Sequence, residues 1–368
     1  MEKDRLELPL FTIYWDQDDI DAINKVIRRG TYWATGSEIS EFEKNIAEYV
    51  GTEYAVVFNS GTSALHSILL ALGIKQGDEV IVPSFTFIST ANSVIFTGAR
   101  PVLADIETDT FGLDLDDVQK KITKKTKAIV PVHYAGCPCY YTKELCKIAE
   151  ENQISVVEDA AAALGAKIGN KKAGTFGDAA MFSFCQNKII TTGDGGAIVT
   201  DSEILYKKLK LIVSHGRSED YVALGYNFRM PTMNAALGNS QLKKIDKILN
   251  MRKRVAEAYH SQLKNIKNIK TMVPPDNFYP SYWIYTIEVK NNLKEKLKAF
   301  LAKNGIFSKL YYDPIHLTKF YKDRFGYKTG DLSITEKVCA KALSLPMSPI
   351  LTREEINYVT ETIRGFFE

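Results

Sequence analysis

The stretch that decides the fold is Tyr54–Pro83, "YAVVFNSGTSALHSILLALGIKQGDEVIVP". Two short, continuously apolar runs flank a segment with helical apolar spacing, and a glycine can end that helix. The same alternation continues through "KAIVPV" at 127–132 and "ISVVED" at 154–159, and persists to about Leu211. Continuous apolar runs separated by amphipathic helices are typical of a mostly parallel sheet that is covered on both faces. The sequence therefore predicts an α/β domain.

Two helices are expected before this region. The first, "DQDDIDAINKVIRRG", begins with a capping aspartate, Asp16, and the second, "SEISEFEKNIAEYVG", is ended by Gly51. After Leu211, residues 230–266 have the pattern of one long helix, with a weak point near Gly238 at most.

A smaller α+β domain is expected at the C-terminal end. The proline-rich stretch "VPPDNFYPSYW" leads to a strand, "IYTIEV", and three helical patterns follow. A long helix commonly links two domains, so we place a large domain at residues 1–245 and a small one at 246–368.

Composition and charge exclude several classes of protein. The 368 residues are 45% hydrophobic and 25% charged, which is typical of a globular protein with a full core. The 47 basic and 44 acidic residues are mixed along the chain, so no nucleic-acid-binding surface is predicted. The N-terminus does not resemble a signal peptide, and no apolar run reaches the roughly 18 residues of a membrane span. We expect a cytoplasmic protein, without membrane contact.

Five cysteines, with one C-x-C pair, do not form a pattern of zinc ligands. We interpret them as reduced thiols and predict no metal site.

Asp159 and Lys188 are the first candidates for chemistry. Asp159 ends an apolar strand, where ligands of open α/β sheets bind, and Lys188 lies between an aromatic run and a glycine-rich turn in "FSFCQNKIITTGDGG". Taken singly, Asp159 is equally well a helix cap or a buried carboxylate, and Lys188 a solvated turn residue. Together they suit pyridoxal phosphate: the amine forms a Schiff base, and the carboxylate keeps the pyridinium nitrogen protonated.

A phosphate site is predicted where the strand "AVVF" meets the following helix. Backbone N–H groups at the helix start, near Thr62, can bind an anion together with the hydroxyls of Thr62 and Ser63. Gly61 allows close approach of the backbone, although most such turns only cap a helix. Ser183 is a second candidate phosphate ligand. Phe87 can stack on the pyridine ring, or it can be an ordinary core aromatic.

These residues resemble a known family. The stretches "NSGTSALHSILLALG", "GDEVIVPSFTFISTANSVIFTGARPVLADI", "PVHYAG", "VVEDAAAALGA", "FSFCQNKIITTGDGGAIVT" and "GYNFRMPTMNAALG" are similar to those of the DegT/StrS sugar aminotransferases. The similarity extends from "TYWATGSEISEFE" to "LPMSPILTREEINYVTETI". It implies fold type I of the aspartate aminotransferase superfamily, with a seven-stranded, mostly parallel sheet.

The resemblance also implies a cofactor, pyridoxal phosphate, with pyridoxamine phosphate as an intermediate. Lys188 would carry the Schiff base, Asp159 would pair with the pyridinium nitrogen, and Phe87 would stack on the ring. The implied phosphate ligands are Gly61, Thr62 and Ser183.

Further site residues follow from the resemblance alone. Asn227, in "GYNFRM", would reach the active site of a neighbouring subunit, which implies a homodimer with shared sites. His316, in "PIHL", matches a substrate-side histidine region, but a buried loop histidine is an equal alternative. Tyr312 and Arg229 are further candidates for substrate contact.

Two features depart from the family pattern. Many relatives have glutamine or histidine three positions after the aspartate, where this chain has Ala162, so the usual hydrogen bond to the cofactor's phenolic oxygen is in doubt. The run "CQNK" also differs from the commoner "HPTK". Both changes are expected to alter the cofactor's environment and the sugar pocket without removing the Schiff base.

The expected reaction transfers an amino group from L-glutamate to a keto sugar linked to a nucleoside diphosphate. Its amino-sugar product would serve the synthesis of a polysaccharide such as lipopolysaccharide, a glycan or an antibiotic. "VHYAG" and "SFTFIST" are more similar to C4 than to C3 aminotransferases, which favours a 4-keto-6-deoxy sugar over a 3-keto sugar or a cyclitol. The sugar and the nucleotide themselves stay open.

Two other functions are alternatives. A dehydratase of the same family has histidine at the position of Lys188, so the lysine argues against that activity. A non-catalytic sensor or regulator on the same scaffold is suggested only by Ala162.

Overall fold

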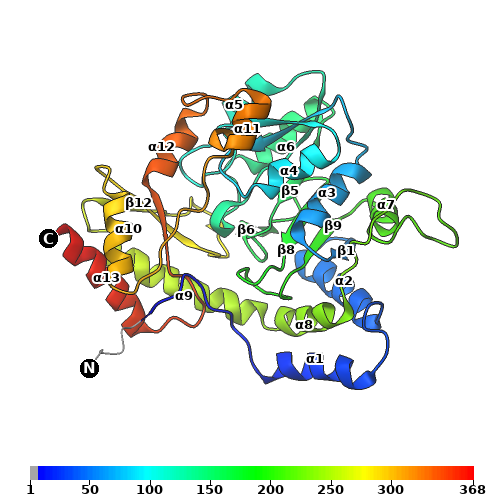
Figure 1. The fold of residues 1–368 in the computed structure, drawn as a ribbon, viewed down its shortest axis with the longest axis horizontal. Coiled ribbons are helices and arrows are strands. Elements are labelled where there is room, and N and C mark those ends of the chain that lie inside the picture. Colours follow the sequence, from blue (N-terminus) through cyan, green and yellow to red (C-terminus); the bar gives the residue numbers. More distant parts are fainter. Residues whose placement is uncertain (1–6) are drawn as a thin grey trace.

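A seven-stranded sheet forms the centre of the larger part of the molecule (Figure 1), in a computed structural model that describes residues 7–368. Strand β9 is antiparallel to both of its neighbours, and the remaining pairs from β8 to β3 are parallel. The predicted mostly parallel sheet is confirmed. In spatial order, the strands are β1 (Tyr54–Phe58), β9 (Gly196–Thr200), β8 (Ala179–Ser183), β5 (Ser155–Asp159), β4 (Thr126–Ile129), β2 (Glu79–Pro83) and β3 (Arg100–Ala104).

Helices cover both faces of this sheet because successive strand residues point to opposite sides. In β1, Val57 packs in the same buried cluster as Phe42 of α2, whereas Val56 packs with Leu65 of α3. None of the helices within residues 7–368 is long and apolar enough to cross a membrane. The helices of the large part that follow α1 are α2 (Ser37–Val50), α3 (Gly61–Ala71), α4 (Ser89–Phe96), α5 (Leu115–Lys121), α6 (Thr142–Glu151), α7 (Glu203–Val213) and α8 (Thr232–Leu242).

Both N-terminal helices form as the sequence predicts. Helix α1 (Gln17–Arg29) begins with a capping box in which the Asp16 carboxylate accepts from a backbone N–H of the first turn. Helix α2 ends at Gly51, whose φ of 93° lies in the left-handed region that favours glycine.

The single long helix expected over residues 230–266 is wrong. The chain forms α8 and then α9 (Ile245–Leu263), with a break at Lys244, whose φ of −106° and ψ of 3° leave the helical region. The Lys244 side chain forms ion pairs with Asp16 and Asp19 at the start of α1. Gly238 is not the weak point: it lies inside α8, where an added Cβ would meet the Phe42 ring at 2.4 Å.

A small antiparallel sheet forms the second part of the molecule. Its spatial order is β10 (Ile269–Thr271), β12 (Tyr285–Val289) and β13 (Ala342–Leu345). Residues of α9, α10 (Lys294–Lys303) and α13 (Arg353–Phe367) share one buried apolar cluster with this sheet. A third sheet connects the two parts, because β11 (Phe278–Tyr279) pairs with the hairpin β6 (Lys167–Ile168) and β7 (Lys171–Lys172).

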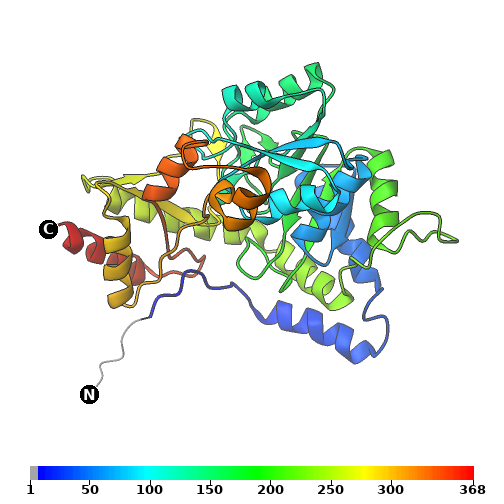
Figure 2. The ribbon, with the colours of Figure 1, turned by 45° about the horizontal axis from the view of Figure 1, so that its top comes forward.

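The chain returns to the large part before it ends. The 3₁₀ turn η2 (Ile315–Leu317) and helices α11 (Lys319–Phe325) and α12 (Ser333–Lys341) lie against the large part in both views, coloured orange (Figures 1 and 2). Tyr321 of α11 donates its hydroxyl to Asn92 of α4 at 2.8 Å. Four α-helices therefore follow β12, one more than expected, and two of them pack on the large part. The boundary at residue 245 stays a prediction.

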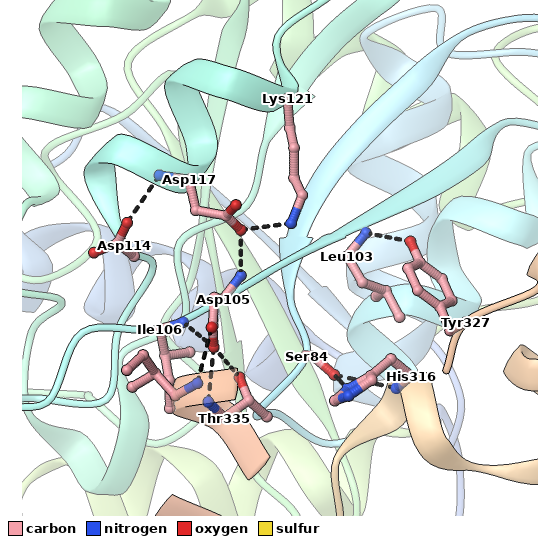
Figure 3. A network of polar contacts seen from close by, with 11 residues as sticks. Ser84, Leu103, Asp105, Ile106, Asp114, Asp117, Lys121, His316, Tyr327 and Thr335 are labelled. Carbon is pink, nitrogen blue, oxygen red and sulfur yellow. Dashed lines mark hydrogen bonds and ion pairs between the residues drawn. The ribbon is translucent and has the colours of Figure 1, made fainter. Parts of the chain in front are cut away.

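Asp105 holds helix α12 in place (Figure 3). Its carboxylate, just after β3, accepts the backbone N–H groups of Ile334 and Thr335 at 2.9 and 2.7 Å, and the Thr335 hydroxyl at 2.8 Å. The Asp105 N–H donates to Asp117 of α5 at 2.6 Å. A carboxylate at a helix start satisfies free N–H groups and complements the helix dipole. Asp105 therefore caps α12 from a distant part of the sequence.

We expect Asp105→Ala to lower the free energy of unfolding by about 2 kcal/mol, because the first turn of α12 loses its cap. Urea unfolding followed by circular dichroism measures this. Asp109→Ala, an exposed carboxylate on the same loop, is the control. Equal stability of the two variants would contradict the capping role.

Candidate active site

One cavity, of about 360 Å³, collects most of the predicted site residues. Its lining comes from segments that are far apart in the sequence, and strands β5 and β8 end at it. Such a place, beyond the carboxyl ends of parallel strands, is where open α/β sheets bind ligands. The predicted residues that line it are Gly61, Thr62, Phe87, Asp159, Ser183, Lys188 and Tyr312.

Lys188 reaches the cavity from the loop between β8 and β9. Its backbone N–H donates to the Cys185 carbonyl at 2.9 Å, which closes a turn, and its Nζ lies 3.8 Å from the centroid of the Trp283 ring. Burial lowers the pKa of Lys188 to about 8, although the nearby charge of Asp159 acts in the opposite direction. An amine with this pKa is partly uncharged near neutral pH, as a nucleophile or general base must be.

Asp159 is buried at the end of β5. Its carboxylate accepts the Thr90 hydroxyl at 2.7 Å and the Ala161 N–H at 3.2 Å. Burial raises the pKa of Asp159, while these two hydrogen bonds and the charge of Lys188 favour the ionised form. A cationic ring nitrogen beside this carboxylate would compensate the cost of burying its charge.

The start of α3 lies against the ends of β8 and β9, where its free N–H groups could hold an anion. Ser60 caps the helix by accepting the Ser63 N–H, so the Ser63 hydroxyl, at 2.9 Å from Ser60 Oγ, is engaged in the cap. The start of the helix lies directly on the sheet: a Cβ added at Gly196 would meet the backbone of Gly61 at 2.7 Å, and one added at Gly61 would meet Ser183 at 3.1 Å. The helix N–H groups and Ser183 therefore share one site.

Aromatic side chains form one wall of the cavity. Phe87 is 54% exposed, and its ring centroid lies 5.7 Å from that of Tyr312. This exposure at the cavity favours a stacking role over the alternative of a core aromatic. Ala162 also lines the cavity.

Besides Ser63, three predicted residues lie outside this cavity. His316 is fully buried, with Nδ1 2.7 Å from Ser84 Oγ (Figure 3). Its Nε2 lies 3.1 Å from Glu336, so the structure favours the alternative of a buried loop histidine. Arg229 lies 3.4 Å from Ser214 Oγ, away from the cavity lining. Asn227 is exposed near the base of the 216–225 loop, and a role in a neighbouring subunit stays a prediction.

Sequence reasoning missed several lining residues. Trp283 and Tyr311 come from the C-terminal part of the chain, and Thr90 from the start of α4. Thr90 ends the segment "SFTFIST" and Trp283 ends the stretch "VPPDNFYPSYW", but no local signal singles out either residue as part of a site.

The cavity fits pyridoxal phosphate. The buried amine and carboxylate, the helix start with Ser183, and the exposed ring of Phe87 supply partners for the aldehyde, the ring nitrogen, the phosphate and the ring face of that molecule. The volume also lies in the range of small-molecule sites.

Thr90→Val should weaken cofactor binding about tenfold, because Asp159 loses a hydrogen bond that favours its charge. Titration with pyridoxal phosphate, followed by absorbance, measures this affinity. Ser93→Ala removes a hydroxyl of the same helix that donates to the Ser89 carbonyl, and it serves as the control. Unchanged affinity in Thr90→Val would show that Asp159 needs no such support.

Comparisons with known proteins agree with this site. Residues 14–364 match the model of the DegT/DnrJ/EryC1/StrS aminotransferase family. The chain is 39% identical to GDP-perosamine synthase of Caulobacter vibrioides over 89% of this chain and 90% of that protein. It is 33% identical to GDP-perosamine synthase of Vibrio cholerae over 98% of this chain and 99% of that protein. Helicobacter pylori PseC, an aminotransferase involved in the biosynthesis of pseudoaminic acid, superposes with a TM-score of 0.92 at 30% identity, over 98% of this chain and 99% of that one.

Proposed function

The chain belongs to the DegT/DnrJ/EryC1/StrS aminotransferase family and is a pyridoxal-phosphate-dependent sugar aminotransferase, and from this premise we propose its two substrates. The amino donor is L-glutamate, and the acceptor is a 4-keto-6-deoxy sugar joined to a nucleoside diphosphate. The observation that carries the proposal is that Lys188 and Asp159 face one cavity beside a helix start.

The residues divide the work of holding the cofactor. The N–H groups at the start of α3, with Thr62 and Ser183, would bind the phosphate. Asp159 would pair with the ring nitrogen, and Phe87 would stack on the ring. When bound, pyridoxal phosphate supplies an electron sink that makes the Cα–H of an amino acid acidic, and it carries the amino group from one substrate to the other.

Lys188 moves the proton. With the cofactor bound, its Nζ would take a proton from Cα of glutamate as a general base and then release that proton as a general acid. With the keto sugar, the same nitrogen transfers a proton in the reverse direction. The lowered pKa of Lys188, about 8, suits a group that must both accept and donate a proton near neutral pH.

The choice of sugar has two supports. Two of the relatives described above are named for a GDP-linked sugar. The segments 84–90 and 132–136, which resemble those of C4 aminotransferases, both contribute residues to the cavity lining. A 3-keto sugar or a cyclitol is the alternative acceptor.

A homodimer with shared active sites is part of the proposal. The 216–225 loop, which follows α7, projects from the molecule at the right of Figure 1. Apolar side chains on it are exposed: Tyr221 at 68%, Val222 at 61% and Leu224 at 82%. Exposed apolar side chains gathered on a projecting loop suit burial against a second copy, and Asn227 lies close to the base of this loop. The cytoplasmic location stays a prediction from the sequence.

The test uses the cofactor-loaded enzyme, glutamate and a panel of nucleotide-linked 4-keto and 3-keto sugars, with mass detection of the aminated product. We expect amination of a 4-keto sugar. Glutamate alone should change the visible absorbance of the loaded enzyme, and a non-catalytic regulator would show no such change. If glutamate acts but no sugar on the panel is aminated, the acceptor proposed here is wrong.

A further inference from the structure

Trp283, just before β12, is held rigidly at the boundary between the two parts of the molecule. It is 3% exposed. Its backbone N–H donates to the Ala135 carbonyl at 3.0 Å, and its carbonyl accepts from Arg252 Nη1 at 3.1 Å. Its indole Nε1–H donates to the Asn187 carbonyl at 2.6 Å. Three hydrogen bonds from three segments therefore fix both the backbone and the ring.

The approach of this segment to the large part depends on a glycine. Ser281 donates its N–H to the Gly136 carbonyl at 2.9 Å, and a Cβ at Gly136 would lie 2.1 Å from Ser281 Oγ. Gly136 also has a φ of 86°, which favours glycine. On its other side, the segment is held by Arg252 of α9, whose guanidinium donates to the carbonyls of Tyr282 and Trp283. The indole thus has little freedom to move.

The indole contacts the loop between β8 and β9 at two points. Its Nε1–H donates to the carbonyl of Asn187, and Nζ of Lys188 lies over its face, 3.8 Å from the ring centroid. A cation over an aromatic face is attracted to the ring, and tryptophan gives the strongest such contact. The ring centroid of Tyr311 lies 5.3 Å from the indole and that of Tyr312 lies 6.4 Å from it, which extends the aromatic wall toward the cavity.

We propose that Trp283 is a positioning residue for Lys188, which orients its free amine and stabilises the ammonium that forms when the amine takes the proton from Cα of the amino donor. This inference rests on the function proposed above. In that step the N–H bond forms as the C–H bond breaks, and the electron pair stays with the substrate. The ammonium is later discharged when the proton is delivered to another carbon. Asp159 and Cys185 are the other titratable groups whose charges act on Lys188.

The first test measures the protonation of Lys188 in the full-length, cofactor-free chain. Reductive methylation with formaldehyde and cyanoborohydride, followed at the Lys188 peptide by mass spectrometry across pH, gives the midpoint for this amine. We expect a midpoint near pH 8 in the parent chain. Trp283→Leu should shift the midpoint below that of the parent, since the ammonium loses the ring face. Trp283→Phe, which keeps an aromatic face, should lie between the two.

Phe300→Leu is the control. The ring centroid of Phe300 lies 5.4 Å from that of Phe366, so this substitution also breaks an aromatic pair. Phe300 is far from Lys188 in the sequence and does not line the cavity. Its midpoint should equal that of the parent. An unchanged or raised midpoint in Trp283→Leu would overturn the inference.

The second test follows the reaction of the loaded enzyme with glutamate that carries protium or deuterium at Cα. Trp283→Leu should slow this half-reaction about tenfold and Trp283→Phe less, and the isotope effect should rise in Trp283→Leu. Cofactor affinity should stay at the level of Phe300→Leu. A slower reaction with an unchanged isotope effect would indicate a merely structural role and contradict the proposal. If the parent enzyme does not respond to glutamate, the proposed function is wrong. The methylation midpoints still show whether Trp283 stabilises the ammonium of Lys188.

Discussion

Lys188→Ala is expected to retain pyridoxal phosphate but to lose turnover by at least about 10³-fold, because no other amine within residues 7–368 lines the cavity and can move the proton. The phosphate cradle and Asp159 remain in this variant. Absorbance of the loaded protein measures cofactor retention, and product formation from glutamate and a keto sugar measures turnover. Lys188→Arg should behave in the same way, since a guanidinium stays protonated.

Lys172→Ala is the matched control. Lys172 also lies over an aromatic ring, with Nζ 4.2 Å from the Tyr49 centroid, but it does not line the cavity. Its replacement should leave turnover near that of the parent enzyme. Normal turnover in either Lys188 variant would refute the proposed mechanism.

Asp159→Asn should reduce the rate of the glutamate half-reaction by about 10² to 10³-fold and weaken cofactor binding. Asparagine keeps nearly the same shape and can still accept the Thr90 hydroxyl, so the variant removes mainly the charge. Without that charge, the ring nitrogen is no longer held protonated, and breaking such a buried pair typically costs several kcal/mol. Single-turnover kinetics with glutamate measure the rate.

Asp178→Asn is the control for this variant. Asp178 accepts the Val156 N–H at 2.8 Å just before β8, at the opposite end of that strand from the cavity. The same chemical change there should leave the half-reaction unaffected. A full rate in Asp159→Asn would mean that the carboxylate has no electronic role.

The sequence predicted the large sheet and the core of the site because both depend on local patterns. Continuous apolar runs identify buried parallel strands, and a polar residue that ends such a run, as Asp159 does, lies at the edge where ligands bind. The two opening helices were equally predictable, since capping groups such as Asp16 lie within the helix's own sequence.

Features that depend on distant contacts were not predictable. The break at Lys244 is accompanied by ion pairs with residues more than 200 positions away, and no local signal marks it. Trp283 reaches the cavity on a segment that packs closely against Gly136, where a Cβ would lie 2.1 Å from Ser281 Oγ. For His316 the sequence leaves a substrate-side role and a buried loop position equally open, and the hydrogen bonds of both ring nitrogens to Ser84 and Glu336 favour the second. In each case, tertiary packing decides what a short sequence window cannot.

The close approach of Gly61 and Gly196 limits how this enzyme can change. A side chain at residue 196 would meet main-chain atoms at 2.7 Å, so residue 196 cannot take one without moving the start of α3 away from the sheet. Tyr311 and Tyr312 also line the cavity, and neither belongs to a strand, so their side chains can be exchanged without disturbing a sheet. Engineering this enzyme toward a different acceptor should therefore begin at these two tyrosines and leave the glycines alone.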